Sequence, residues 1–147
     1  MNRDFAEMLA GLSEAGADFM VIGAHAVAVH ARPRATGDLD IWVRPTPENA
    51  QRVWAALAAF GAPLDLLTRD DLTSNDLVFQ IGVEPNRIDI LTSIGGVAFA
   101  DAWARRTTVE LWGISVPVIG REDLVASKRA AGRPQDLADL AELERSS

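Results

Sequence analysis

The sequence predicts one α/β (α+β) domain over residues 1–147, in which a mixed β-sheet is flanked by helices. The chain has 147 residues, 48% of them hydrophobic, which is enough for one buried core. Short apolar runs typical of strands are separated by segments whose apolar residues have helical spacing. No repeat, low-complexity tract or linker-like stretch indicates a second domain.

In the N-terminal half, the expected elements alternate between helix and strand. The alanine-rich segment that follows Gly23 predicts a short helix, although Val27 and Val29 leave a strand open as an alternative. Acidic and apolar side chains alternate after Gly37, which predicts a strand with two unlike faces. The expected elements are a helix over 4–15, a strand over 19–22, a short helix over 24–31, a loop over 32–37, a strand over 38–43 and a helix over 47–60 ended by Gly61.

The C-terminal half predicts two strand pairs and two final helices. Turn-forming residues separate the strands of each pair, as expected for hairpins. Gly132 and Pro134 are typical of a helix end followed by a new helix start. The expected elements are an irregular stretch over 62–75 with one helical turn around Asp70, strands over 77–82 and 87–91, a helix over 98–105, strands over 107–112 and 115–119 turning at Gly113, a helix over 122–131, and a last helix that begins at Pro134.

Composition excludes several classes of protein. With no cysteine, the chain has no disulfide framework and no thiolate metal site. No apolar run reaches the roughly 20 residues that a bilayer span needs, so we expect a cytoplasmic protein without a membrane partner. The formal net charge of −7 disfavours nonspecific binding to DNA, because such affinity comes from lysines and arginines.

The strand over 38–43 carries the clearest candidate site. Asp38 and Asp40 project from the same face of this strand, with Cα atoms about 6.5–7 Å apart. Magnesium prefers oxygen ligands and is usually shared between one or two carboxylates and the phosphates of a substrate. The pair therefore suits a magnesium site. An Asp-x-Asp pair also occurs on solvent-exposed strand faces without a function, and both interpretations stay open here.

Two neighbouring features are compatible with a phosphate site. Gly23 and Ala24 stand between a strand and a helix, where unpaired backbone N–H groups bind phosphate well, although an ordinary tight turn would use the same residues. Asp89 is flanked by Ile88 and Ile90 in a strand. It is either an acid with a function or an acid that simply faces water while the isoleucines face the core.

Taken together, these residues resemble a known family. Segments 21–28 and 34–43 look like the signature of small bacterial nucleotidyltransferases of the DNA polymerase beta-like superfamily: a strand, a glycine turn, a helix, and a strand with Asp-x-Asp, followed by a third acid, here Asp89. The run over 128–140 is similar to the Lys…Arg-x-x-Asp helix pair of AbiEii-like toxins and related resistance nucleotidyltransferases. The resemblance implies a nucleotidyltransferase fold with a C-terminal helix pair.

The resemblance also implies a reaction and its site residues. Asp38, Asp40 and Asp89 would be catalytic carboxylates that bind two magnesium ions about 3.5–4 Å apart when a nucleotide is bound. Asp89 could also take the proton of the acceptor hydroxyl. A nucleoside monophosphate would move from a nucleoside triphosphate to this hydroxyl, with release of pyrophosphate. The implied nucleotide-binding residues are Gly23, Ala24, Arg34, Thr36 and Lys128, although a lysine on a terminal helix is by default solvent-exposed.

One departure from the family pattern supports a second interpretation. Many active members have Gly-Ser or Gly-Gly where this chain has Gly23-Ala24, so a serine hydroxyl that could contact the triphosphate is absent. A catalytically degenerate module that binds a nucleotide or a partner protein, in the manner of a toxin–antitoxin regulator, is therefore the alternative. The acceptor is left open between a small molecule, a transfer RNA and a protein. His25 and His30 are five residues apart and are not expected to be metal ligands.

Overall fold

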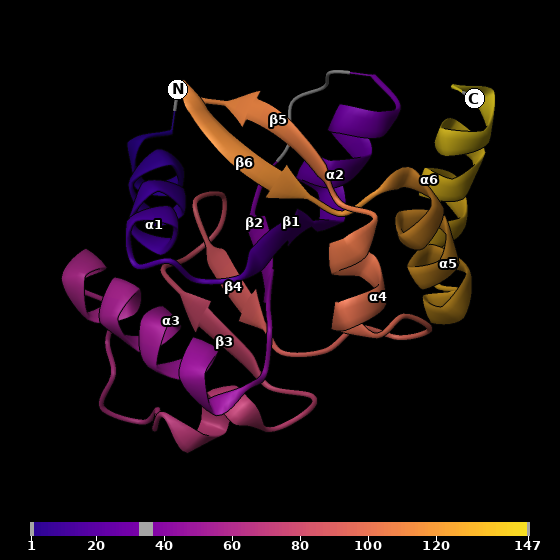
Figure 1. Ribbon diagram of the computed structural model, residues 1–147. Helices are drawn as coiled ribbons and strands as arrows, with labels where there is room; N and C mark the ends of the chain where they lie inside the picture. The colour runs from indigo at the N-terminus through magenta and orange to yellow at the C-terminus, as the bar shows by residue number, and fades with distance from the viewer. Residues whose placement is uncertain (1, 33–36, 147) are drawn as a thin grey trace.

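The computed structural model describes residues 2–32 and 37–146, and its elements follow the expected order (Figure 1). They are α1 (Arg3–Glu14), β1 (Phe19–Ile22), α2 (Gly23–His30), β2 (Leu39–Val43), α3 (Pro47–Phe60), the 3-10 turn η1 (Asp70–Thr73), β3 (Val78–Ile81), β4 (Ile88–Leu91), α4 (Phe99–Ala104), β5 (Thr107–Leu111), β6 (Ile114–Val118), α5 (Arg121–Ala131) and α6 (Pro134–Arg145). The segment after Gly23 is a helix and not a strand, with Ala26 and Val27 fully buried.

Six strands form one mixed sheet in the order β3-β4-β2-β1-β6-β5. The pairs β1/β2, β3/β4 and β5/β6 are antiparallel, whereas β2/β4 and β1/β6 are parallel. The two expected hairpins and the mixed sheet flanked by helices are therefore confirmed. The parallel pairing of β2 with β4 brings together two strands that are distant in the sequence.

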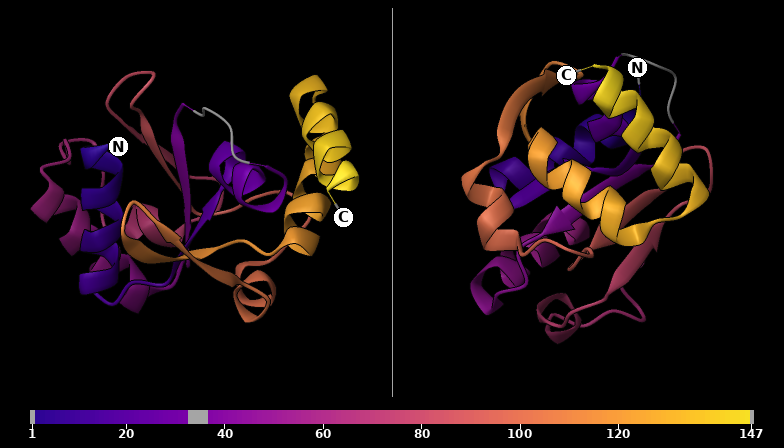
Figure 2. Two further views of the ribbon diagram at one scale, coloured as in Figure 1. Left: turned by 90° about the horizontal axis from the view of Figure 1, so that it is seen from above. Right: turned by 90° about the vertical axis from the view of Figure 1, so that its right-hand side faces the viewer.

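Helices cover both faces of the sheet. α1 and α3 lie side by side on one face, and α2, α5 and α6 lie on the other (Figures 1 and 2). Alternation along β2 explains this division, because Leu39, Ile41 and Val43 are fully buried on one face. Asp40 and Trp42 point to the opposite face, where the Trp42 ring packs edge-on against Phe99 of α4 at 5.1 Å. The acids of β2 thus face the layer that contains the C-terminal helix pair.

Local backbone signals set the ends of the helices. α3 begins with Thr46 as N-cap and Pro47 in its first turn, and it ends at Gly61, whose φ is 91°. Gly132, with φ 62°, ends α5, and Pro134 begins α6 two residues later. In the described part of the chain, no helix is both long enough and apolar enough to cross a membrane.

Candidate active site

The three acidic side chains meet at the start of β2 and β4. Asp40 and Asp89 are register partners in the parallel pair β2/β4, so their side chains project from the same face of adjacent strands. Asp38 stands two residues before Asp40 and shares that face. Asp89 is only 8% exposed, which excludes an acid that simply faces water. Asp40 and Asp89 therefore lie on adjacent strands as the sequence predicted, whereas Asp38 directly precedes β2.

Arg87 lies between two of these carboxylates. Its Nη2 is 3.0 Å from Asp38 Oδ2, its Nε is 3.1 Å from Asp89 Oδ1, and its backbone N–H donates to Asp38 Oδ1 at 3.3 Å. The Nε contact is an ion pair without hydrogen-bond geometry, because Arg87 Nε and Asp89 Oδ1 are both buried atoms that make no hydrogen bond within the described residues. Arg87 was not among the site residues predicted from the sequence, although its two-residue spacing from Asp89 on a strand indicates a shared face.

Burial and mutual repulsion perturb the carboxyl groups. Burial raises the pKa of Asp40 to about 6, assisted by the negative charge of Asp89, by a hydrogen bond between the two carboxyl groups and by Asp38. Burial also raises the pKa of Asp89, against the lowering effect of Arg87. Within residues 2–32 and 37–146, the Arg87 guanidinium pairs with Asp38 and Asp89 and not with Asp40, and the charge of Lys128 only partly offsets the rise in the pKa of Asp40. A cation bound beside Asp40 would favour the ionised form.

Glycine at position 23 is required by the position of Asp40. Gly23 has φ 70°, and a Cβ built on it would overlap the Asp40 carboxylate. Ile22 pairs with Asp40 in the β1/β2 register, so the first turn of α2 starts directly beside this acid. Ile22, the N-cap residue of α2, offers no side-chain hydrogen bond to the helix. The first backbone N–H groups of α2 are thus available to a ligand at the edge of the acidic cluster.

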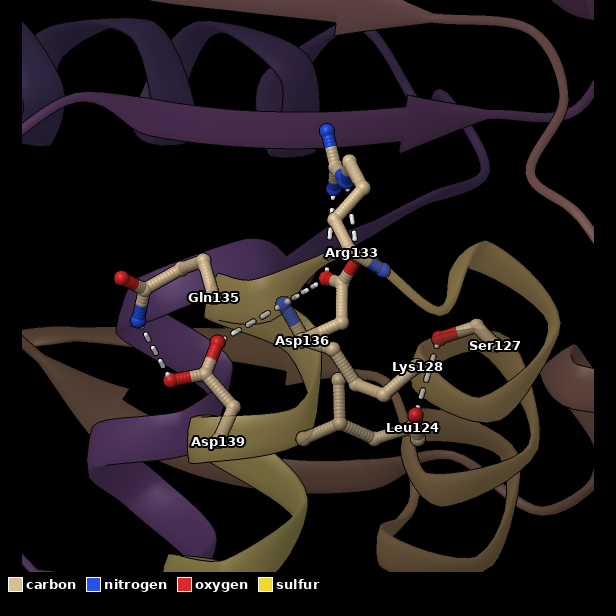
Figure 3. Close-up of polar contacts among 7 residues, drawn as sticks. All are labelled: Leu124, Ser127, Lys128, Arg133, Gln135, Asp136 and Asp139. Carbon is tan, nitrogen blue, oxygen red and sulfur yellow. Dashed lines mark hydrogen bonds and ion pairs between the residues drawn. The ribbon is translucent and has the colours of Figure 1, made fainter.

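Lys128 is buried in an ion-pair network between α5 and α6 (Figure 3). Its side chain is 12% exposed, and Nζ is 3.0 Å from Asp139 Oδ2 and 3.4 Å from Asp136 Oδ1. Gln135 Nε2 donates to Asp139 Oδ1 at 3.0 Å. The default expectation of a solvent-exposed lysine is therefore wrong, because two buried carboxylates need its charge.

Arg133 completes this network from the turn between the two helices. Its Nε donates to Asp136 Oδ2 at 2.7 Å and its Nη2 donates to Asp136 Oδ1 at 3.2 Å. These bonds, the backbone N–H of Arg133 and the charge of Lys128 lower the pKa of Asp136 to about 2. Asp136 therefore stays ionised and joins α5 to the start of α6.

A cavity of about 250 Å³ separates the acidic strand from the helix pair. Asp40 and Gly23 line one wall, while Ser127, Lys128 and Arg133 line the other. Lys128 is close enough to oppose the rise in the pKa of Asp40. The expectation that the helix pair brings Lys128 toward the acids is confirmed. Asp40 is the acid on the strand side of the cavity, and Lys128 and Arg133 line the helix side together with the ionised Asp136. Charged groups of both signs therefore face this space.

Comparison with known families gives the class of the protein. Residues 1–147 match the sequence profile of a family described as nucleotidyl transferase of unknown function (DUF2204). The chain belongs to this family. It is therefore a nucleotidyl transferase by family, in agreement with the resemblance in its sequence motifs. No protein of curated function matches the chain in sequence.

Two solved structures share the fold of this nucleotidyl transferase. TM1012 from Thermotoga maritima, classed with the nucleotidyltransferases, has 15% identity and a TM-score of 0.63, and the match covers 99% of this chain and 92% of that protein. The lincosamide antibiotic adenylyltransferase LnuA, solved with lincomycin bound, has 12% identity and a TM-score of 0.65 over 100% of this chain and 98% of LnuA. At these identities the likeness shows the fold. Neither comparison singles out the AbiEii-like subgroup.

Some residues expected in the site of the nucleotidyl transferase are not placed. Arg34 and Thr36 lie outside the described residues. Ala24 follows Gly23 in the first turn of α2 and is half-buried. In the described ranges, no group of three or more histidine, aspartate or glutamate side chains is arranged to hold a metal ion. Arg87 pairs with both Asp38 and Asp89.

Proposed function

We propose that this nucleotidyl transferase moves a nucleoside monophosphate from a nucleoside triphosphate to an acceptor hydroxyl in a magnesium-dependent reaction. The observation that carries the proposal is the cavity with Asp40 on one wall and Lys128 on the other. Ordinary structural ion pairs would bring these charges into contact. Here a space of about 250 Å³ lies between them, and a metal-bound triphosphate is complementary to both walls.

The donor set suits magnesium by its chemistry. Asp89 Oδ1 is a buried oxygen that makes no hydrogen bond within the described residues, and Asp40 faces it from the next strand. Asp40 and Asp89 would hold the metal, and Asp38 would join them once Arg87 releases it. Bound magnesium would neutralise charge on the triphosphate and acidify the acceptor hydroxyl.

The chain's own residues would position the triphosphate. Lys128 has three N–H donors, and Asp136 and Asp139 take two of them, which leaves one for a phosphate oxygen. Backbone N–H groups at the start of α2 would bind a second phosphate, and these do not depend on the hydroxyl that Ala24 lacks. Lys128, Arg133 and Asp136 are the residues of the AbiEii-like Lys…Arg-x-x-Asp pattern in this sequence.

Asp89 would act as the base. The acceptor oxygen bonds to the α-phosphorus, the bond from that phosphorus to the oxygen bridging to the β-phosphate breaks, and pyrophosphate leaves. The acceptor proton would pass to Asp89, because a neighbouring cation keeps its carboxylate ionised and able to accept a proton. The net reaction converts a triphosphate and an alcohol into a phosphodiester and pyrophosphate.

The test separates nucleotide binding from transfer. Melting temperature is measured with each nucleoside triphosphate, with and without magnesium, and pyrophosphate release is then followed with candidate acceptors. One nucleotide with magnesium should raise the melting temperature more than either component alone. Asp89→Asn should abolish pyrophosphate release. If nucleotide and magnesium raise the melting temperature of wild type and Asp89→Asn equally, Asp89 is not part of the site.

The degenerate binding module predicts a different result. Ala24 and the placement of Arg87 between two carboxylates are the observations that favour it. Such a protein would gain stability from the nucleotide and release no pyrophosphate with a small molecule, a transfer RNA or a protein as acceptor. Ala24→Ser, which restores a hydroxyl at the first turn of α2, would then leave pyrophosphate release absent.

A further inference from the structure

A second cavity, of about 430 Å³, lies at the edge of the sheet beyond Asp38. Five segments of the chain line it: the N-terminus of α1, the side of α2, Gly37 just before β2, the turn between β3 and β4, and the turn between β5 and β6. The lining residues used below are Asn2, Phe5, His25, Gly37, Asn86 and Trp112. None of them lines the cavity beside Lys128, so the two spaces are separate.

Three aromatic rings form one wall of this second cavity. His25 lies edge-on to Phe5 at 5.6 Å and to Trp112 at 5.4 Å, and Phe5 lies edge-on to Trp112 at 5.7 Å between ring centroids. Phe5 is 2% exposed and belongs to the core, whereas His25 and Trp112 are half-buried. Burial lowers the pKa of His25, which keeps the wall uncharged near neutral pH. The ring of a ligand can therefore pack against this uncharged aromatic wall.

The backbone holds Trp112 in place at an energetic cost. Trp112 has φ 51° and Gly113 has φ 79° in the two-residue turn between β5 and β6. Such turns favour asparagine, aspartate or glycine at the first position, because both residues have positive φ. A bulky side chain is strained in this conformation, and strain of this kind concentrates at ligand sites. Tryptophan at this position therefore does not stabilise the turn.

The opposite rim of the second cavity is polar and adjoins the acids. Asn2 Nδ2 donates to Asn86 Oδ1 at 2.8 Å, which joins the N-terminus to the β3–β4 turn. Gly37 directly precedes Asp38, and Asn86 directly precedes Arg87, whose N–H donates to Asp38. Asp40 thus lines the first cavity, and Asp38 directly follows Gly37, which lines the second. In-line transfer needs the attacking and leaving oxygens on opposite sides of the phosphorus.

We propose that the second cavity is the acceptor subsite and that it takes a small molecule whose hydroxyl-bearing ring stacks on Trp112. The inference rests on the proposed function, because it requires the nucleoside triphosphate and the acceptor molecule to approach the acids from different sides. A volume of about 430 Å³ is in the range of small-molecule sites. The net charge of −7 disfavours a transfer RNA, and ring stacking combined with amide groups suits a sugar or a hydroxylated aromatic ring.

The test follows the four tryptophan indole N–H signals by nuclear magnetic resonance in isotope-labelled protein. The probe is phenyl β-glucoside, which carries both an aromatic ring and ring hydroxyls. The Trp112 signal should shift on titration, and Trp112→Asn should weaken binding at least tenfold while preserving the turn. Trp112→Phe should retain most of the affinity. Trp54→Phe is the matched control, because Trp54 lies on α3 under the Arg69 guanidinium at 5.0 Å.

Three outcomes would overturn the inference: no shift of Trp112 with the probe, unchanged binding in Trp112→Asn, or displacement of the probe by magnesium and nucleotide. Failure of the proposed function gives a different signature. Magnesium and nucleotide would then leave the backbone signals of Gly23 and Lys128 unmoved, whatever the probe does at Trp112. The two failures are read from different residues in one experiment.

Discussion

Replacing Asp40 with asparagine should stabilise the metal-free protein and abolish its response to magnesium. The substitution keeps the size of the side chain and removes the charge that burial and Asp89 oppose. The pKa of Asp40 rises from its usual 3.8 to about 6 in the folded protein. At about 1.36 kcal/mol per pKa unit, this shift corresponds to about 3 kcal/mol, and solvent screening reduces the expected gain to about 1–2 kcal/mol.

The sign of this effect gives a pH signature. Between the unfolded and folded pKa values of Asp40, the folded state holds a proton that the unfolded state has lost. Wild-type stability without metal should therefore fall as pH rises from 3.8 to about 6 and then level off. Asp40→Asn lacks this contribution. The difference between the two proteins should be small near the lower limit of this window and largest above its upper limit.

The assay is urea unfolding in chelator at several pH values, followed by melting curves with magnesium and each nucleotide. A gain of about 1–2 kcal/mol corresponds to a rise of roughly 2–8 °C in melting temperature for a chain of this size. Wild type should respond to magnesium, and Asp40→Asn should not. Equal metal responses, or a metal-free variant less stable than wild type at every pH, would refute the reasoning.

Three further predictions follow from individual contacts. Gly23→Ala should lower the free energy of unfolding, measured by urea titration, by at least about 2 kcal/mol, because the added methyl group overlaps the Asp40 carboxylate. Gly16→Ala is the control: Gly16 has φ 72° and no atom within 4 Å of an added Cβ, so this substitution should cost only about 1 kcal/mol. Arg87→Met should lower the melting temperature in chelator and increase the rise that magnesium produces; an unchanged rise would mean that Arg87 does not compete with a cation. Lys128→Met should cost about 3 kcal/mol in urea unfolding because two buried carboxylates lose a partner, and adding Asp139→Asn should recover part of that loss, a result that a purely solvated lysine would not show.

Much of the order of elements was predictable because its signals are local. Alternation of acidic and apolar residues before Val43 indicated a two-faced strand, and Gly132 with Pro134 indicated the break between α5 and α6. Boundaries differ from expectation by about one residue, as they do at α1 and α5, because helix ends depend on caps such as Asn2. The helix after Gly23 was ambiguous from the sequence, since valine is compatible with both structures, and packing of Val27 against the core decided it.

The sequence by itself indicated the acids of the candidate site, and the tertiary structure decided which of them meet. Asp38 and Asp40 share a face because of strand periodicity alone. Asp89 joins them only because β4 pairs with β2 in parallel and in register, which no local pattern specifies. Lys128 was predicted from the sequence to lie toward the acids, but its pairing with Asp136 and Asp139 follows only from the packing of α6 on α5. Side-chain direction follows from local backbone geometry, whereas charge pairing between distant segments follows from how the elements pack.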